Sequence, residues 1–263
     1  MQPKYHVAIA GWSIRSEQAG LFAGDGSHLQ RYASKFDAVE INSSFYRSHK
    51  RDTYERWAET VPPAFRFAVK MPKSLTHEGC LRDTGKPLTQ FLAEIAGLGN
   101  KLGAVLIQLP PSLAYDPRIV ESFFTALRAR YRGPVVCEPR HPTWFSGAAD
   151  RRLEAHGAGR VAADPSCGDC GDEPCGSERI AYFRLHGSPV MYHSSYEEQY
   201  LERLAASMRA LARDRPVWCV FDNTARGAAT LNALALAERL GISAAAAAPS
   251  PRPRRRTPVV TDR

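Results

Sequence analysis

The chain has 263 residues, of which 44% are hydrophobic and 10% aromatic, which is enough to build a sizeable core and excludes wholesale disorder. Its formal net charge is +8, and arginines near the C-terminus supply part of that excess. The rest of the chain is therefore only mildly basic, which suits an anionic small molecule as well as a nucleic acid.

Neither a secretion signal nor a membrane span is predicted. The apolar stretch at 7–10 is too short for the hydrophobic part of a signal peptide, and nothing approaches the roughly 18 consecutive apolar residues of a membrane helix. Six cysteines without a secretion signal indicate reduced thiols. We therefore expect a cytoplasmic protein that does not associate with a membrane.

Short apolar runs rich in β-branched residues alternate with segments of helical spacing. Several runs are continuously apolar, which is typical of parallel strands that are covered on both faces. The expected strands are 6–10, 38–41, 65–70, 104–108, 134–138, 160–163, 181–185 and 217–221. The expected helices are 29–36, 53–61, 88–98, 118–131, 150–156, 197–213 and 225–240, and the connection 164–180 has no helical pattern.

Eight strands alternating with helices predict an α/β fold, a single TIM-barrel-like (β/α)8 domain over residues 1–243. An open doubly wound sheet is the alternative. Residues 244–263 are rich in alanine, proline and arginine and have no apolar periodicity, so we expect a flexible basic tail. A nucleic-acid-binding arm is the other interpretation of this tail, but no aromatic residue lies between its arginines.

Polar or charged residues end seven of the eight expected strands. Residues two apart in a strand point the same way, and the carboxyl ends of parallel strands meet at one rim, where active sites of barrels are built. A solvated rim with structural ion pairs would give the same pattern. The candidate site residues are Glu40, Asn42, Lys70, His77, Gln108, Glu138, Arg140, His141, Arg184, His186 and Asn223.

Six blocks in this part of the chain resemble the YecE-like family, also called domain of unknown function 72. They are VEINSSFYR, FRFAVKMPKSLTH, KLGAVLIQLPPS, CEPRHPTW, YFRLHGSPVMYHSSY and VWCVFDN, in this order. The resemblance covers about residues 7–240 and implies a TIM-barrel-like fold and a cytoplasmic origin in bacteria or archaea. It implies no established reaction, substrate or cofactor. All the candidate site residues match its motif positions.

The segment CGDCGDEPC departs from that pattern. Cys167 and Cys170 have the C-x-x-C spacing of metal ligands, and Cys175 follows five residues later. A structural zinc site needs four ligands and no fourth is evident. We therefore expect a surface insertion with free thiols, with zinc or an iron–sulfur cluster as the alternative.

Phosphate-binding, dinucleotide-binding, metalloprotease and serine-hydrolase motifs are all absent, and the cofactor is unknown. We expect an enzyme for an anionic or polar small molecule, in which Glu138 or His186 transfers protons and Arg140, Arg184 and Lys70 hold the anion. The first alternative is a metal-dependent hydrolase or isomerase with Glu40, Glu138, Asp164 and His186 as ligands. The second is a barrel that binds a ligand or nucleic acid without catalysis.

Overall fold

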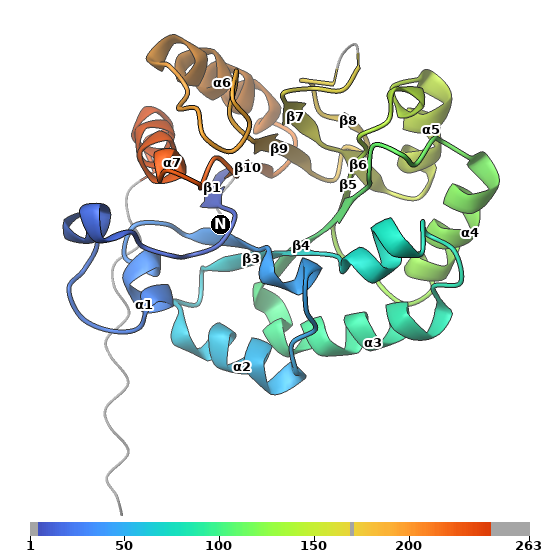
Figure 1. The fold of residues 1–263 in the computed structure, drawn as a ribbon, viewed down its shortest axis with the longest axis horizontal. Coiled ribbons are helices and arrows are strands. Elements are labelled where there is room, and N and C mark those ends of the chain that lie inside the picture. The colour runs from blue at the N-terminus through green and yellow to red at the C-terminus, as the bar shows by residue number, and fades with distance from the viewer. Residues whose placement is uncertain (1–4, 169–170, 243–263) are drawn as a thin grey trace, which may run out of the picture.

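The computed structural model describes residues 5–168 and 171–242, in which helices surround a central set of strands (Figure 1). The strands are β1 Tyr5–Ile9, β2 Ala38–Ile41, β3 Arg66–Lys70, β4 Leu102–Gln108, β5 Val135–Glu138, β6 Ala158–Arg160, β7 Ala162–Asp164, β8 Cys175–Gly176, β9 Ala181–Leu185 and β10 Val217–Phe221. The α-helices are α1 His28–Ala33, α2 Arg51–Thr60, α3 Gly85–Ile95, α4 Pro117–Arg128, α5 Gly147–Ala155, α6 Glu198–Leu211 and α7 Ala228–Arg239.

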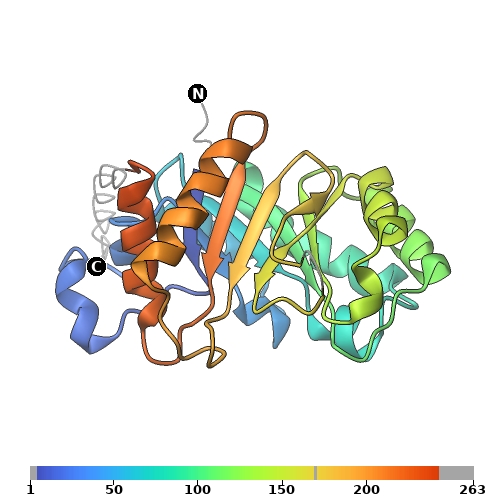
Figure 2. The same ribbon diagram turned by 90° about the horizontal axis from the view of Figure 1, so that it is seen from above.

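The strands form two sheets. One has the order β1-β10-β9-β7, and the other has the order β2-β3-β4-β5-β6-β8. All pairings are parallel except that of the short β8 with β6. Apart from β8, the strands run in one direction with helices outside them (Figure 2). The α/β class with parallel strands is therefore confirmed.

A closed barrel, in contrast, is not found, because the hydrogen-bonded ladder breaks at two places. Between β1 and β2 the pairing is reduced to one bridge, from Ala10 to Glu40. The expected sixth strand is split: Val161 donates its N–H to Cys137 O at 2.8 Å, and the next residue, Ala162, pairs with Phe183 instead. The segment 158–164 thus passes from one sheet to the other.

Strand alternation produces two apolar cores. The strand faces toward the helices and the inner faces of those helices form the larger core. Ile41 of β2 and Phe123 of α4 are two of its members. The opposite faces form a smaller core in which alanines on β1–β4 face large aromatic side chains. Its Trp218 stacks on Tyr182 with ring centroids 6.0 Å apart. Small side chains on four strands thus leave room for two large ones.

Local signals explain several helix boundaries. Ser27 and Gln30 form a reciprocal capping box at the start of α1, and Asp116 caps α4 just before Pro117. The expected helix 225–240 begins only at Ala228, because Gly227 precedes it with φ 78°. In the described part of the chain no helix is both long and apolar enough to cross a membrane.

The connection after β7 has no helix in its described residues, as the sequence predicted. It carries β8, which the sequence did not predict. Cys175 in β8 and Cys167 are free and partly buried. Cys170 lies outside the described residues, so the arrangement of the three cysteines stays a prediction, as does the tail at 244–263.

Candidate functional site

Seven charged or titratable side chains meet at the carboxyl ends of the strands, and we call this group the rim cluster. Its members are Glu40, Lys70, Glu138, Arg140, Arg184, His186 and Asp222, each at most 9% exposed. They come from β2, β3, β5, β9 and β10 or the residues that directly follow these strands. Several continue the alternation of the smaller core, so that Arg184 follows Tyr182 on the same face.

Arg184 is the centre of the rim cluster. It donates to Glu40 from Nη2 at 2.8 Å and from Nε at 3.1 Å. Its Nη1 lies 3.2 Å from Glu138 Oε2, and its Nη2 lies 3.0 Å from Asp222 Oδ2. Three carboxylates therefore surround a guanidinium that has no exposure to solvent. Such a saturated arginine has little capacity left for an anionic ligand.

His186 lies between two carboxylates. Its Nδ1 is 3.1 Å from Asp222 Oδ2, and its Nε2 is 2.8 Å from Glu138 Oε1. The ring can donate to both carboxylates only when it carries both protons. Nε2 is also in contact with Arg140 Nη2. This nitrogen can accept a hydrogen bond from the guanidinium only when it carries no proton itself. His186 therefore links Asp222 on one side to Glu138 and Arg140 on the other.

Arg140 lies at the solvent side of the rim cluster. Its Nη2 donates to Glu138 Oε1 and is in contact with His186 Nε2. Its Nε is buried and has no hydrogen-bond partner in the described part of the chain. An unpaired donor on a buried guanidinium is costly, so this atom is a candidate contact for a ligand.

The charges within the rim cluster fix the ionisation of its carboxyl groups. Burial acts to raise the pKa of Glu138, but Arg184 and Arg140 outweigh it and hold that pKa well below its usual range. The pKa of Asp222 is lowered in the same way: burial opposes the shift, and Arg184 with His186 produces it. Both groups are therefore carboxylates at neutral pH, and weak bases for that reason.

Lys70 differs from the two arginines. Its Nζ lies 4.2 Å from the centroid of the Phe45 ring, a cation–π contact, and it makes no hydrogen bond or ion pair with the described residues. Burial, together with the positive charge of Arg184, lowers the pKa of Lys70 to about 8, although Glu40 and two other carboxylates oppose the shift. The His77 ring packs on the same Phe45 side chain, and the two ring centroids lie 4.9 Å apart.

The remaining candidates have more local surroundings. Asn223 donates to Ser194 O and to Asn232, which ties the end of β10 to the β9–α6 loop and to α7. His141 accepts from the N–H of Thr143 and so begins a short 3-10 turn outside the rim cluster. Two further positions complete the set: Asn42, whose Oδ1 is buried without a partner in the described part, as is Asn223 Oδ1, and Gln108, which ends β4 half-buried.

Two members of this neighbourhood were not among the candidates from the sequence. Asp222 joins Arg184 and His186, and the Tyr182 hydroxyl donates to Glu40 Oε2 at 2.9 Å. Both lie on the alternating pattern, since Asp222 follows Val220 and Tyr182 precedes Arg184 by two residues. A strict application of the period of two to these strands would have found them.

The carboxylates of the rim cluster face guanidinium groups. Glu40, Glu138 and Asp222 each contact Arg184. Within residues 5–168 and 171–242, no group of three or more His, Cys, Asp and Glu side chains is arranged to hold a metal ion. The ligand set of the metal-dependent alternative is therefore not assembled among these residues.

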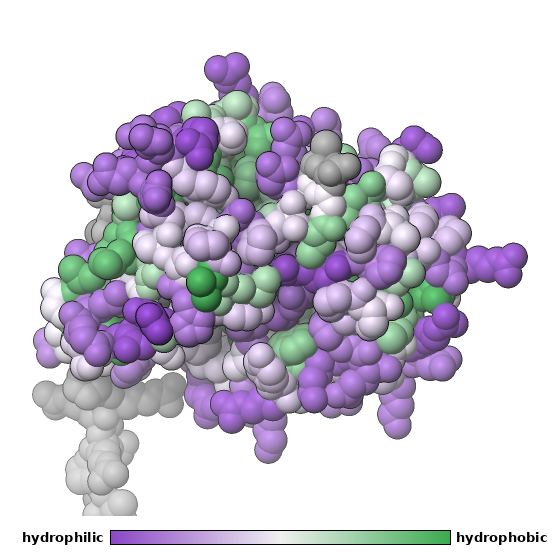
Figure 3. Space-filling view, turned by 45° about the horizontal axis from the view of Figure 1, so that its top comes forward, coloured by the Kyte–Doolittle hydropathy of each residue, from purple (hydrophilic) through white to green (hydrophobic). Residues whose placement is uncertain are grey.

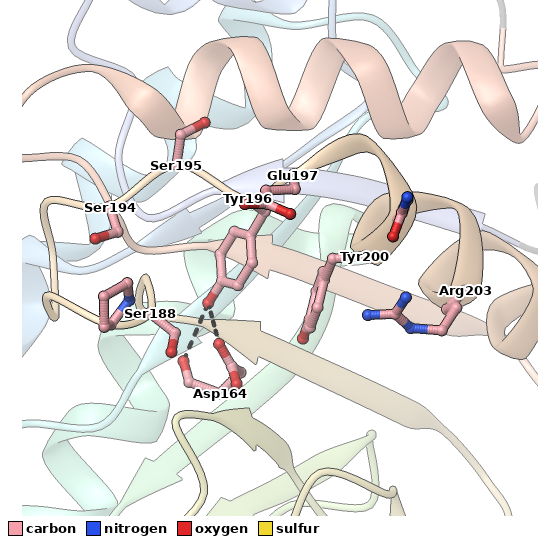
Figure 4. Close-up of a pocket in the computed structure, with 10 residues that line it drawn as sticks. Asp164, Ser188, Ser194, Ser195, Tyr196, Glu197, Tyr200 and Arg203 are labelled. Atoms are coloured by element: carbon pink, nitrogen blue, oxygen red, sulfur yellow. Dashed lines mark hydrogen bonds between the residues drawn. The ribbon is translucent and has the colours of Figure 1, made fainter.

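A hollow of about 430 Å³ lies between the end of β7 and the start of α6, and no residue of the rim cluster lines it (Figure 4). The Tyr196 hydroxyl donates to Asp164 Oδ2 at 2.7 Å and accepts from the N–H of Gly187 at 2.8 Å. Figure 4 shows Tyr200 and Arg203 at the helix side of this hollow. The face of the molecule seen in the space-filling view is mostly hydrophilic, with scattered apolar residues (Figure 3).

Parallel strands that place buried ion pairs at their carboxyl ends define an α/β protein with a polar rim. The family described as protein of unknown function DUF72 matches residues 6–257, and the chain belongs to this family.

Curated relatives and solved structures agree with this membership. The chain is 31% identical over 144 residues to UPF0759 protein YecE of Escherichia coli K12, and this match spans about half (52%) of each chain. It is 25% identical over 275 residues to UPF0759 protein YunF of Bacillus subtilis, covering 90% of this chain and 95% of YunF.

Two solved DUF72 proteins have the same fold. One from Enterococcus faecalis superposes with a TM-score of 0.77 at 20% identity, covering 94% of this chain and 99% of its own. One from Thermotoga maritima superposes with a TM-score of 0.74 at 24% identity, covering 90% and 99%. At this identity the likeness concerns the fold alone.

Proposed function

We propose that this DUF72 protein is an enzyme that binds an anionic or polar small molecule at the carboxyl ends of its strands. In this proposal the two sheets act together as one TIM-barrel-like wall, since segment 158–164 belongs to both and Ala10 bridges to Glu40. Free cysteines in the described part are compatible with a cytoplasmic location, which we also propose.

The observation that carries the proposal is a set of polar atoms left without partners at the rim. Arg140 Nε, Asn42 Oδ1 and Asn223 Oδ1 are buried and unpaired in the described part of the chain, and the Lys70 ammonium touches only an aromatic ring. Buried polar groups are usually hydrogen-bonded. A ligand with an anionic group for the cations and hydroxyl groups for the amide oxygens would complete them.

The roles of the charged residues follow from their surroundings. Arg184 is saturated by three carboxylates, so we assign it to holding the rim cluster together. Arg140 and Lys70 are the cations that would contact the anion. For proton transfer we prefer His186 to Glu138, because the low pKa of Glu138 makes it a weak base.

Calorimetric titration with propionate, phosphate and gluconate tests the proposal. We expect at least one of them to bind saturably to the wild-type protein, and Arg140→Gln to weaken that binding at least tenfold, about 1.4 kcal/mol. Arg152→Gln is the matched control, because Arg152 also pairs with a glutamate, Glu121, but is 39% exposed and lies on α5, outside the rim cluster. Equal binding by both variants, or no saturable binding at all, would refute the proposal.

A further inference from the structure

The amine of Lys70 is held in an unusual environment for a lysine. It extends from the end of β3 into the rim cluster, and the residue is 5% exposed. The Phe45 ring lies 4.2 Å below Nζ, and no hydrogen bond or ion pair in the described part holds this nitrogen. Packing against Phe45 thus sets the direction of the Lys70 side chain. The lone pair or the protons of its amine remain available to a substrate.

This environment also favours the neutral amine. Burial and the charge of Arg184 lower the pKa of Lys70 to about 8. About a tenth of the amine is then neutral at pH 7, compared with less than about one part in a thousand for a lysine with an ordinary pKa near 10.4. A neutral amine is the nucleophilic form.

We infer that Lys70 is a catalytic nucleophile that forms an imine with the carbonyl group of an α-oxo acid. The inference rests on the proposed function, whose anion-binding site it extends with a covalent step. The substrate class follows from the neighbours: the carboxylate of the oxo acid would pair with Arg140, whose Nε is unpaired, and its carbonyl carbon would face the amine. Hydroxyl groups on the substrate would suit Asn42 Oδ1.

The step balances without a redox partner. The Nζ lone pair forms a C–N bond while the carbonyl π electrons move to oxygen; the nitrogen then loses a proton and the oxygen gains one, which gives a carbinolamine. The carbinolamine hydroxyl then takes a proton and leaves as water, and the nitrogen lone pair closes the C=N bond. In this inference His77, whose ring packs on the Phe45 ring that Lys70 also contacts, is the titratable group that would exchange these protons.

Reductive trapping tests the inference. The full-length protein is incubated with pyruvate or glyoxylate and sodium cyanoborohydride, and the adduct is located by intact mass and peptide mapping. We expect one adduct, on Lys70, in the wild-type protein and its loss in Lys70→Arg. The control is Lys73→Ala, because Lys73 lies three residues away, is 47% exposed and pairs with Glu78; this variant should be labelled like the wild type.

The pH dependence of the trapping rate provides a second readout. A nucleophile whose pKa is about 8 should reach half its limiting rate near pH 8, whereas exposed lysines should still be gaining rate above pH 9. Folding of each variant is checked by circular dichroism. If Lys70→Arg does not fold, competition in the wild-type protein between propionate and the labelling of Lys70 replaces the comparison.

The outcomes separate this inference from the proposed function. No adduct on Lys70 with either oxo acid, or equal labelling of exposed lysines, overturns the imine. Saturable propionate binding that depends on Arg140 would in that case leave the proposed function standing. An adduct on Lys70 without any carboxylate binding would support the nucleophile and count against the proposed anion site.

Discussion

Glu138 has no exposure to solvent, and its carboxylate is in contact with Arg140, Arg184 and His186. A buried charge is tolerated because its partners compensate it, and removing one partner leaves the others uncompensated. From the sequence we expect a glutamate that a ligand can reach, and a buried ion-pair cluster is the alternative. The full burial of Glu138 favours a structural role for this carboxylate. That role does not depend on which ligand the neighbouring cations bind.

We therefore expect Glu138→Gln to lower the free energy of unfolding by about 3–5 kcal/mol, because the amide leaves two buried arginines undercompensated. Urea unfolding at pH 7 measures this. The control is Glu121→Gln, which removes a glutamate that is 46% exposed and pairs with Arg152, and it should cost no more than about 1 kcal/mol. If both variants lost less than about 1 kcal/mol, water would have to reach Glu138 in the folded state.

Alternation along single strands made part of the site predictable. Glu138 with Arg140, and Arg184 with His186, are two residues apart, and the structure brings all four together. The sequence alone could not show that His141 lies outside the rim cluster, because its ring turns back to accept a hydrogen bond from the N–H of Thr143 in a local turn. Which cations are saturated could not be predicted either, since that depends on strands far apart in the sequence.

At the scale of elements, the sequence predicted each long strand and helix to within a few residues. It did not predict β8, because β8 is two residues long and exists through its antiparallel pairing with Gly159 and Arg160. It also did not predict that segment 158–164 changes sheets. A strand's neighbours are set by tertiary packing, which a hydrophobic pattern does not report.

Packing between elements explains a glycine in β4. A Cβ on Gly103 would lie 2.5 Å from Trp218 Cζ2 and 2.9 Å from its Cη2. Trp218 stacks on Tyr182, whose hydroxyl donates to Glu40 in the rim cluster. The absent side chain in β4 therefore lets the indole fill the smaller core and support the ring that orients Glu40.

We expect Gly103→Ala to destabilise the protein by about 1–3 kcal/mol, because the indole must shift within a packed core. The near-UV circular dichroism of the aromatic side chains should change with it. Gly85→Ala is the matched control: nothing lies within 4 Å of its Cβ position at the start of α3, so it should be neutral or slightly stabilising. A Gly103→Ala protein as stable as Gly85→Ala would show that Trp218 relocates freely.

At the scale of the whole molecule, the larger core extends to the end of the described chain. The helix α7 supplies buried Ala233 and Leu236 to the larger core, and Leu240 and Ile242 pack against it from the end of the described chain. The domain predicted as residues 1–243 thus includes α7 and these contacts, and its boundary at 243 stays a prediction. The prediction that residues 244–263 are dispensable for folding remains to be tested, because they lie outside the described residues.

A stop codon after Ser243 tests it. We expect the melting temperature to stay within about 2 °C of the wild type, since a loss of 1 kcal/mol would shift it by about 2–4 °C in a domain of this size. A stop after Ala235 is the contrast, because it removes buried Leu236 and Ala237 and should lower the melting temperature severely. The first truncation also tests the nucleic-acid interpretation of the arginines at 252–256: salt-sensitive binding of an oligonucleotide by the full chain, lost on removal of residues 244–263, would assign them to a binding arm. A fall of many degrees after the first stop would instead mean that these residues dock on the domain.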